Sequence, residues 1–124
     1  MNPSDIRITA RTQYLPEQSK PAQRQFAFAY EITIANLGTT SVQLISRHWV
    51  IVDAHDKTQE VRGVGVVGEQ PRIEPGQSYR YTSGVVLGTG HGTMTGSYRM
   101  QDSTGAEFDA AIPLFALAMP GTIH

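Results

Sequence analysis

The sequence predicts an all-β fold, and three observations support this prediction. Apolar and polar side chains alternate with a period of two in several segments, whereas no segment shows the period of about 3.6 residues of an amphipathic helix. Twelve glycines and seven prolines among 124 residues supply frequent turns. Valine, threonine and tyrosine, which favour strands, recur between those turns. These features are typical of short strands that bury one face.

The first half of the chain contains the clearest strands. Residues 6–14 alternate regularly, and residues 26–35 place large apolar side chains on one face and small or polar ones on the other. Between them, residues 15–25 contain two prolines and mixed charges, which predicts an exposed loop. Residues 42–53 form a third strand whose alternation slips near its start, which predicts a β-bulge. Its Trp49 is the chain's single tryptophan and the expected core anchor.

The second half continues the pattern, with turn signals at short and fairly even spacing. Four further strands are expected there, over residues 58–66, 78–85, 94–100 and 108–112. Seven strands, or slightly more, predict an immunoglobulin or fibronectin type III-like β-sandwich. Neither an internal repeat nor a linker interrupts the sequence, so we expect a single domain over residues 1–124.

Charge and composition argue against several classes of protein. Ten Lys and Arg residues against eleven Asp and Glu residues give a net charge of −1, which disfavours nucleic acid or an anionic membrane as a partner. The absence of cysteine removes disulfides, thiolate zinc sites and cysteine nucleophiles. The sequence shows no signal peptide and no apolar stretch of the roughly 20 residues that span a bilayer. We therefore expect a cytoplasmic location.

Residues 63–68 spell the dinucleotide-binding pattern GxGxxG. In a dinucleotide-binding fold, a helix follows the glycines and its N-terminus holds the pyrophosphate. Here Pro71 and Pro75 forbid a continuous helix. A P-loop is excluded too, because Glu69 occupies the position of the required lysine. We interpret the pattern as a glycine-rich strand end and turn.

Four segments, at residues 28–34, 46–49, 64–71 and 96–98, carry a resemblance to a known family. Taken together they resemble the bacterial ApaG family, also called CorD, which has a DUF525-type domain. The resemblance implies a fibronectin type III-like sandwich and a role associated with cobalt and magnesium efflux or resistance. It also implies a link to genes for dinucleoside polyphosphate breakdown. Similar modules in eukaryotic F-box and DNA-polymerase-interacting proteins imply protein recognition, and the family implies no established catalytic residue.

The glycine-rich segment is a candidate site for a phosphate or an acidic partner. The backbone N–H groups of Gly63, Gly65 and Gly68 can form an anion-binding nest. Arg62 and Arg72 can add charge-assisted contacts. The alternative is that the glycines permit a bulge or the close approach of another backbone.

Two histidines, His48 and His55, are candidate metal ligands. Together with nearby aspartates they are residue types that suit Co²⁺, Ni²⁺ or Zn²⁺. No recognised ligand spacing is present, however, and residues 53–57 also compose an ordinary polar turn. We favour the turn and expect no bound cofactor.

The sequence assigns no catalytic residue. Ser46, His48 and Asp53 have the residue types of a hydrolase triad, but proximity in sequence says nothing about their geometry. No nucleophile elbow and no paired-carboxylate pattern occurs. We therefore expect that the protein is not an enzyme.

The C-terminal residues 110–122 contain no charged side chain and include Leu114 and Phe115. They either cover an open sheet edge or present an apolar patch to a protein partner or to a second copy of the chain. Both residues are candidate partner-binding residues, as are Glu69 and Gln70 in the glycine-rich loop.

The sequence thus predicts a non-enzymatic binding module that recognises a protein partner through the loops at residues 63–71 and 88–92. The alternative is a protein that binds or hydrolyses dinucleoside polyphosphates through the nucleotide or pyrophosphate contacts of residues 63–68. A metal-sensing module is the third hypothesis.

Overall fold

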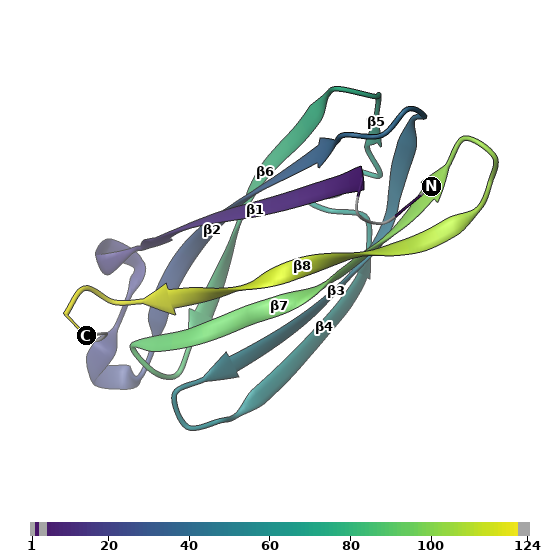
Figure 1. The fold of residues 1–124 in the computed structure, drawn as a ribbon. Helices are drawn as coiled ribbons and strands as arrows, with labels where there is room; N and C mark the ends of the chain where they lie inside the picture. Colours follow the sequence, from purple (N-terminus) through teal and green to yellow (C-terminus); the bar gives the residue numbers. More distant parts are fainter. Residues whose placement is uncertain (1, 3–4, 122–124) are drawn as a thin grey trace.

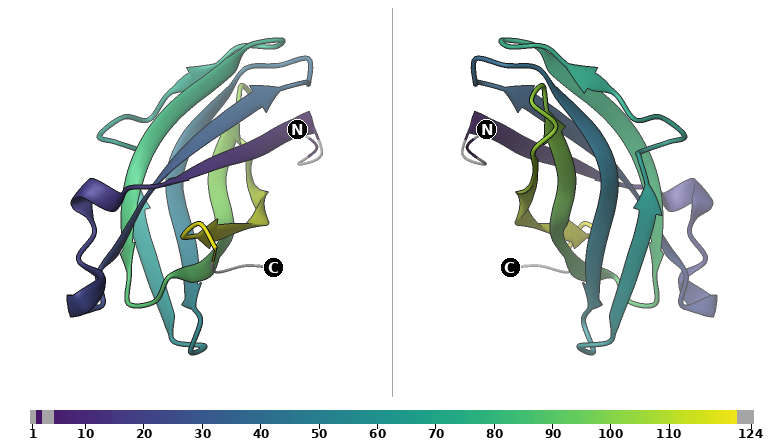
Figure 2. Two further views of the ribbon diagram at one scale, coloured as in Figure 1. Left: turned by 90° about the vertical axis from the view of Figure 1, so that its left-hand side faces the viewer. Right: turned by 90° about the vertical axis from the view of Figure 1, so that its right-hand side faces the viewer.

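Two antiparallel sheets pack as a β-sandwich in the computed structural model, which describes residue 2 and residues 5–121 (Figure 1 and Figure 2). One sheet has the strand order β1-β2-β6 and the other has the order β4-β3-β7-β8, with the short β5 paired to β3. The strands are β1 (Ile6–Tyr14), β2 (Phe26–Asn36), β3 (Val42–Asp53), β4 (Thr58–Val64), β5 (Arg72–Ile73), β6 (Ser78–Leu87), β7 (His91–Asp102) and β8 (Glu107–Ala118). The predicted immunoglobulin or fibronectin type III-like fold is confirmed.

The structure differs from the prediction at several places, and β6, β7 and β8 are all longer than expected. β4 ends at Val64 instead of Val66, because a tight turn begins there. β5 is not among the strands expected from the sequence; it pairs with β3, and its Ile73 is buried opposite Val42. The loop between β1 and β2 contains two short 3₁₀ turns, η2 (Pro16–Gln18) and η3 (Pro21–Gln23), each begun by a proline.

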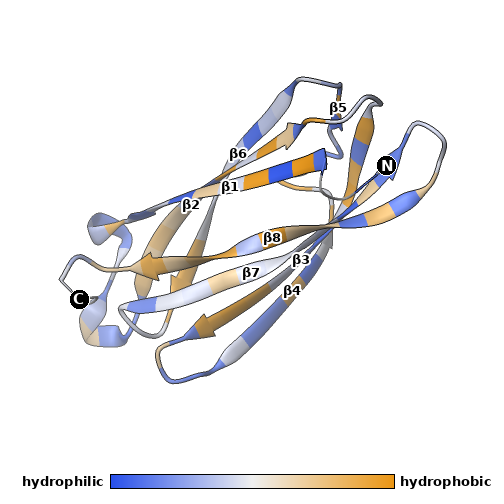
Figure 3. Ribbon diagram, in the orientation of Figure 1, coloured by the Kyte–Doolittle hydropathy of each residue, from blue (hydrophilic) through white to orange (hydrophobic). Residues whose placement is uncertain are grey.

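The core lies between the sheets and centres on aromatic side chains. Trp49 is 2% exposed, and its ring packs edge-on against Tyr30, Tyr98 and Phe115, with ring-centroid distances of 5.4, 6.1 and 5.9 Å. Such pairs contribute roughly 0.5–1.5 kcal/mol each beyond the burial of apolar area. The alternation that predicted the strands is visible along β1, where hydrophobic and hydrophilic residues succeed one another (Figure 3). Trp49 is thus the core anchor that the sequence predicts.

A β-bulge in β3 decides which of its side chains face the core. The register with β7 shifts between Leu44 and Ser46. Val42 and Leu44 are buried before the bulge, and Trp49 and Ile51 are buried after it. The bulge therefore reverses the phase of the strand, as the slipped alternation predicts, and turns Ser46 and His48 to the outer face.

The C-terminal segment is an edge strand of the five-stranded sheet. β8 pairs with β7 as far as Ala118, and a register shift leaves Pro113 and Leu114 opposite a single residue of β7. This bulge accommodates the proline and leaves Leu114 64% exposed, whereas Phe115 packs on the core. The segment thus covers the core with most of its apolar side chains, and Thr122 lies outside the described residues.

β8 also meets the other sheet. It runs beside β1 at one side of the sandwich, where the Thr12 hydroxyl donates to the carbonyl of Ala116 at 3.3 Å (Figure 1). Among the described residues, no helix has the length and apolar character that crossing a bilayer requires.

Candidate functional site

The GxGxxG segment forms the end of β4 and a tight hairpin turn. Val66 and Glu69 exchange two backbone hydrogen bonds, with N···O distances of 2.8 and 2.9 Å. Val67 and Gly68 occupy the two central positions with φ of 42° and 81°, the signs that a type I′ turn requires. The described residues that follow are not helical. The segment is a strand end and turn, as the sequence predicts.

Two glycines of this segment leave room for other groups. The guanidinium of Arg47 lies over Gly63, where a Cβ atom would come within 2.7 Å of it. From there Arg47 Nη1 donates to the carbonyls of Val64 and Gly65 at 3.2 and 2.9 Å. Gly65 has φ of 64°, and a Cβ atom on it would overlap the carbonyl oxygen of Glu69. Both glycines therefore permit a close approach, which is the structural role that the sequence offered beside anion binding.

Side chains tie this hairpin to both sheets. The hydroxyl of Tyr79 on β6 donates to Glu69 Oε2 at 2.9 Å. Gln70 Nε2 donates to the carbonyl of Ile45 on β3 at 3.0 Å, and Gln43 Nε2 donates to the Gln70 carbonyl at 3.1 Å. Burial of the phenol, together with the Glu69 carboxylate, raises the pKa of Tyr79 above its ordinary value. Glu69 and Gln70 therefore hold the turn in place.

Two buried tyrosines share a hydrogen bond between the sheets. The hydroxyls of Tyr81 on β6 and Tyr98 on β7 are hydrogen-bonded to each other, and Tyr98 is fully buried. Desolvation raises the pKa of both phenols well above the ordinary value. Both side chains stay neutral, and each supplies a hydrogen-bond partner that a buried hydroxyl requires.

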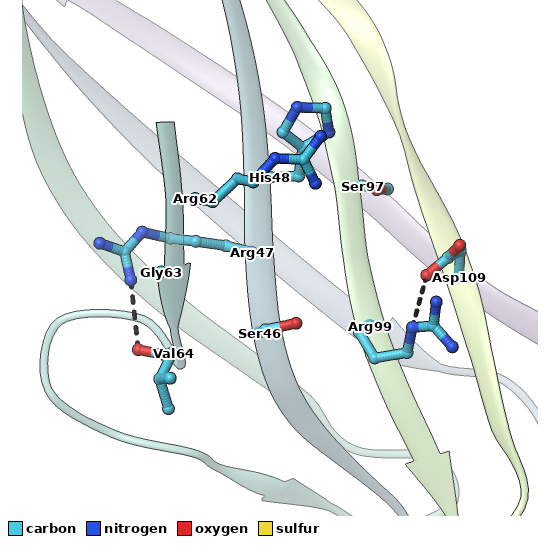
Figure 4. Close-up of a pocket in the computed structure, with 9 residues that line it drawn as sticks. All are labelled: Ser46, Arg47, His48, Arg62, Gly63, Val64, Ser97, Arg99 and Asp109. Carbon is cyan, nitrogen blue, oxygen red and sulfur yellow. Dashed lines mark hydrogen bonds and ion pairs between the residues drawn. The ribbon is translucent and has the colours of Figure 1, made fainter. Parts of the chain in front are cut away.

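A hollow of about 500 Å³ lies on the outer face of the five-stranded sheet, beside the hairpin (Figure 4). We call it the outer hollow. It is lined by Ser46, Arg47, His48, Arg62, Gly63, Val64, Ser97, Arg99 and Asp109.

The strand register explains why the surface of the sheet is hollowed there. Arg62, His48 and Ser97 align across β4, β3 and β7 in one row. In the next row Ser46 lies between Val64 and Arg99. The short side chains of Ser46 and Ser97 stand next to the longer ones of His48 and Arg99, so the outer hollow forms over the serines (Figure 4).

Most charges around the outer hollow are paired. His48 Nε2 lies 2.9 Å from Glu60 Oε1. Arg99 contacts two carboxylates, those of Asp109 at 3.0 Å and Glu107 at 3.5 Å. Exposed pairs of this kind contribute little to stability, but they determine which charges remain available to a ligand.

The two arginines that were predicted to assist an anion lie apart. Arg62 pairs with His48 in the middle of β3 and borders the outer hollow. Within the described residues its guanidinium has no ion pair or hydrogen bond. Arg72 pairs with Gln43 near the start of β3, and its Nη1 lies 3.5 Å from Ser41 Oγ. Five positions of β3 separate the two rows, which corresponds to about 16 Å along the strand.

The two candidate metal ligands also lie apart. His48 is in the middle of β3, whereas His55 is in the turn that follows it. In that turn Asp53 Oδ1 accepts hydrogen bonds from the N–H groups of Lys57 and His55 at 2.9 and 2.8 Å. The bond from Lys57 is the main cause of a lowered pKa for Asp53. Asp53 thus serves the polar turn that the sequence favours over a metal site.

Neither a metal cluster nor the triad-type set is assembled in the part of the chain that the structure describes. No three His, Cys, Asp or Glu side chains converge there as metal ligands do. Ser46 and His48 share the outer face, whereas Asp53 is engaged by its own turn.

Sequence reasoning missed Arg47, Ser97 and Arg99. Ser97 and Arg99 belong to β7 and reach the outer hollow only through the register of that strand with β3. Arg47 gains its role because Gly63 stands opposite it on β4. The alternation of single strands contains no signal for such cross-strand pairs.

Fold and site together define a fibronectin type III-like β-sandwich domain with a clamped hairpin and a polar hollow on one sheet. Residues 16–102 match the model of the ApaG domain. Protein ApaG of Pseudomonas paraeruginosa is 59% identical over 119 residues, which cover 96% of this chain and 94% of that relative. Protein ApaG of Thiobacillus denitrificans is 56% identical with the same coverage. The chain belongs to the ApaG domain family.

A solved structure agrees with this assignment. The crystal structure of a Bordetella pertussis protein described as ApaA matches with a TM-score of 0.92 and 47% sequence identity. The match covers 95% of this chain and 96% of that chain.

Proposed function

We propose that this chain is a non-enzymatic binding module that recognises a protein partner in the cytoplasm. It does so through the hairpin at residues 64–69, which we call the recognition hairpin, and the adjoining outer hollow. The observation that carries the proposal is the conformation of Val67. This side chain is 56% exposed and has φ of 42°.

The backbone of Val67 is strained. A β-branched residue at positive φ costs roughly 1–3 kcal/mol, and glycine or asparagine would occupy the position with less strain. Val67 is not among the side chains that form or flank the hydrophobic core. A strained and exposed apolar side chain supports a contact made outside the chain.

The surroundings of Val67 suit such a contact. Val64 is 74% exposed and lines the outer hollow together with Arg62, so the exposed apolar surface of the recognition hairpin continues to the border of a polar site. Arg47 and Tyr79 hold the recognition hairpin in one conformation before a partner arrives. A preformed surface lowers the ordering cost of association.

The same geometry gives less support to the nucleotide alternative. The N–H groups of Gly65, Val66 and Glu69 donate to backbone carbonyls within the chain. Only the amides of Val67 and Gly68 in the turn are left for a phosphate, without the helix N-terminus that a pyrophosphate site uses. The family resemblance implies a role in cobalt or magnesium tolerance. In this proposal, the chain contributes to that tolerance by recognising a protein partner.

Affinity capture with variants of the recognition hairpin tests the proposal. Tagged wild-type protein, Val64→Thr and Val67→Asn are used to capture proteins from a bacterial lysate, with quantification by mass spectrometry. Both substitutions remove exposed apolar surface, and asparagine tolerates the positive φ at position 67. We expect a partner that the wild type captures and that both variants retain about tenfold less.

Val86→Thr is the matched control, since Val86 is 57% exposed on β6, on the other sheet. It should capture the partner as the wild type does. A protein set that is the same for all four baits contradicts the proposal. Thermal unfolding of each variant separates lost recognition from lost folding.

A further inference from the structure

The outer hollow has a donor-rich composition that restricts its ligand. We infer that it binds the carboxylate of an aspartate or glutamate side chain presented by the protein partner, with Arg62 as the principal contact. This inference rests on the proposed function. It adds the chemical class of the group that enters the outer hollow.

The groups left without partners are hydrogen-bond donors. Within the described residues the Arg62 guanidinium has no ion pair, and the hydroxyls of Ser46 and Ser97 make no hydrogen bond. A guanidinium only donates, and a hydroxyl can donate to any acceptor. The carboxylates around the outer hollow are already engaged, Glu60 by His48 and Asp109 by Arg99. A ligand that complements the outer hollow therefore supplies a hydrogen-bond acceptor that carries a negative charge.

A single negative charge fits better than a phosphate dianion. Among the described residues that line the outer hollow, Arg62 and Arg47 have no carboxylate partner, whereas Arg99 has two carboxylates within 3.5 Å. The Arg47 guanidinium is engaged by the carbonyls of Val64 and Gly65, which leaves Arg62 as the cation available to a ligand. Asp109 lines the same outer hollow and repels a second negative charge. A carboxylate matches one guanidinium in a two-bond arrangement. Ser97 lies two strands from Arg62, about 10 Å across the sheet. The arginine side chain is long enough that a carboxylate bound to it can also contact the Ser97 hydroxyl.

The apolar border identifies a polypeptide as the source of this carboxylate. Val64 lines the outer hollow and is largely exposed, and Val67 stands at the tip of the adjoining hairpin. A small anion would leave both valines in water. A peptide segment that combines an acidic residue with an apolar neighbour covers the valines and satisfies Arg62 together.

Selection of peptides from a phage library of random twelve-residue sequences tests the inference. The full chain is the bait, as wild type, Arg62→Gln and the control Arg11→Gln. Arg11 is an exposed arginine on β1, on the other sheet, so both substitutions remove the same charge. We expect sequences with an Asp or Glu beside an apolar residue on the wild type and on Arg11→Gln. Arg62→Gln should lose the acidic preference.

The outcomes separate the inference from the function on which it rests. If the selected peptides lack acidic residues, the inference of a carboxylate ligand is wrong, although peptide recognition is still supported. The same conclusion follows if Arg62→Gln selects the same acidic peptides as the wild type. Selection of no sequence at all overturns both.

Binding of the selected peptide is then mapped by amide NMR on the labelled full chain. We expect saturable shifts at Arg62 and Ser97, and binding about tenfold weaker when the acidic residue of the peptide becomes its amide. Inorganic phosphate is titrated in a parallel arm. Saturation of the same amides by phosphate at lower concentration than by the peptide would show a small-anion site and contradict the inference.

Discussion

Arg47 on β3 occupies the space above Gly63 on β4, and this cross-strand pair holds the recognition hairpin. The guanidinium needs a position without a side chain beneath it, and from there it binds the carbonyls of Val64 and Gly65. The first glycine of the GxGxxG pattern therefore provides the space that the Arg47 guanidinium occupies.

Gly63→Ala should lower the free energy of unfolding by about 1–3 kcal/mol, because the added methyl group displaces the guanidinium. Urea denaturation measures the change. Combining it with Arg47→Met should cost less than the sum of the two single changes, since the displaced group is then absent. Additive effects would contradict the contact.

The three glycines should not be equally sensitive. Gly68→Ala places a Cβ atom in open space at φ of 81°, so we expect a loss of about 1 kcal/mol from backbone strain alone. Gly65→Ala adds a clash with the Glu69 carbonyl and should cost about 3 kcal/mol. Equal losses in denaturation of the two variants would argue against the turn geometry.

Val67→Asn should raise the free energy of unfolding by about 1 kcal/mol, because asparagine tolerates the left-handed region better than valine does. Val86→Asn is the control, since Val86 lies in a regular strand and should lose stability. A variant that is more stable yet binds its partner less well would show that valine is retained for contact. A destabilised Val67→Asn would remove the strain argument.

The buried tyrosine pair predicts a specific alkaline response. Folding raises the pKa of Tyr81 and Tyr98, so above about pH 10 the unfolded chain releases phenolic protons that the folded chain keeps. Their contribution to stability is complete below the unfolded pKa and is lost as the pH rises above it. Urea denaturation is measured between pH 8 and pH 11 in about half-unit steps. The free energy of unfolding should fall more steeply with pH for the wild type than for the double variant Tyr81→Phe/Tyr98→Phe.

At neutral pH, Tyr98→Phe alone should cost about 1 kcal/mol, because the Tyr81 hydroxyl loses its partner. The double Phe variant should be no less stable than that single variant. A double variant that loses the sum of both single effects would contradict the shared hydrogen bond.

Alternation of side chains was sufficient to predict the sandwich. Large residues at every second position of β2 and the slipped phase of β3 identified the buried faces, including Trp49. β8 was predicted too short, because residues 113–118 acquire their strand conformation from pairing with β7 across a bulge. Single-strand patterns do not contain that pairing.

The candidate site was only partly accessible from sequence. Proline placement excluded a helix after the GxGxxG segment, and the turn followed from its glycines. The outer hollow depends on registers that bring Ser97 and Arg99 of β7 beside Ser46 of β3. The position of Arg62 within it was not predictable without those registers.

The bulge in β8 has a consequence for how copies of the chain meet. Pro113 lacks an N–H group, and the bulge displaces its neighbours from the straight line that an added strand would need. Toward the C-terminus of the strand, the carbonyl of Ala116 already accepts a hydrogen bond from the Thr12 hydroxyl of β1. An incoming strand therefore finds no continuous row of donors and acceptors along β8, and this side of the sandwich resists stacking into fibrils.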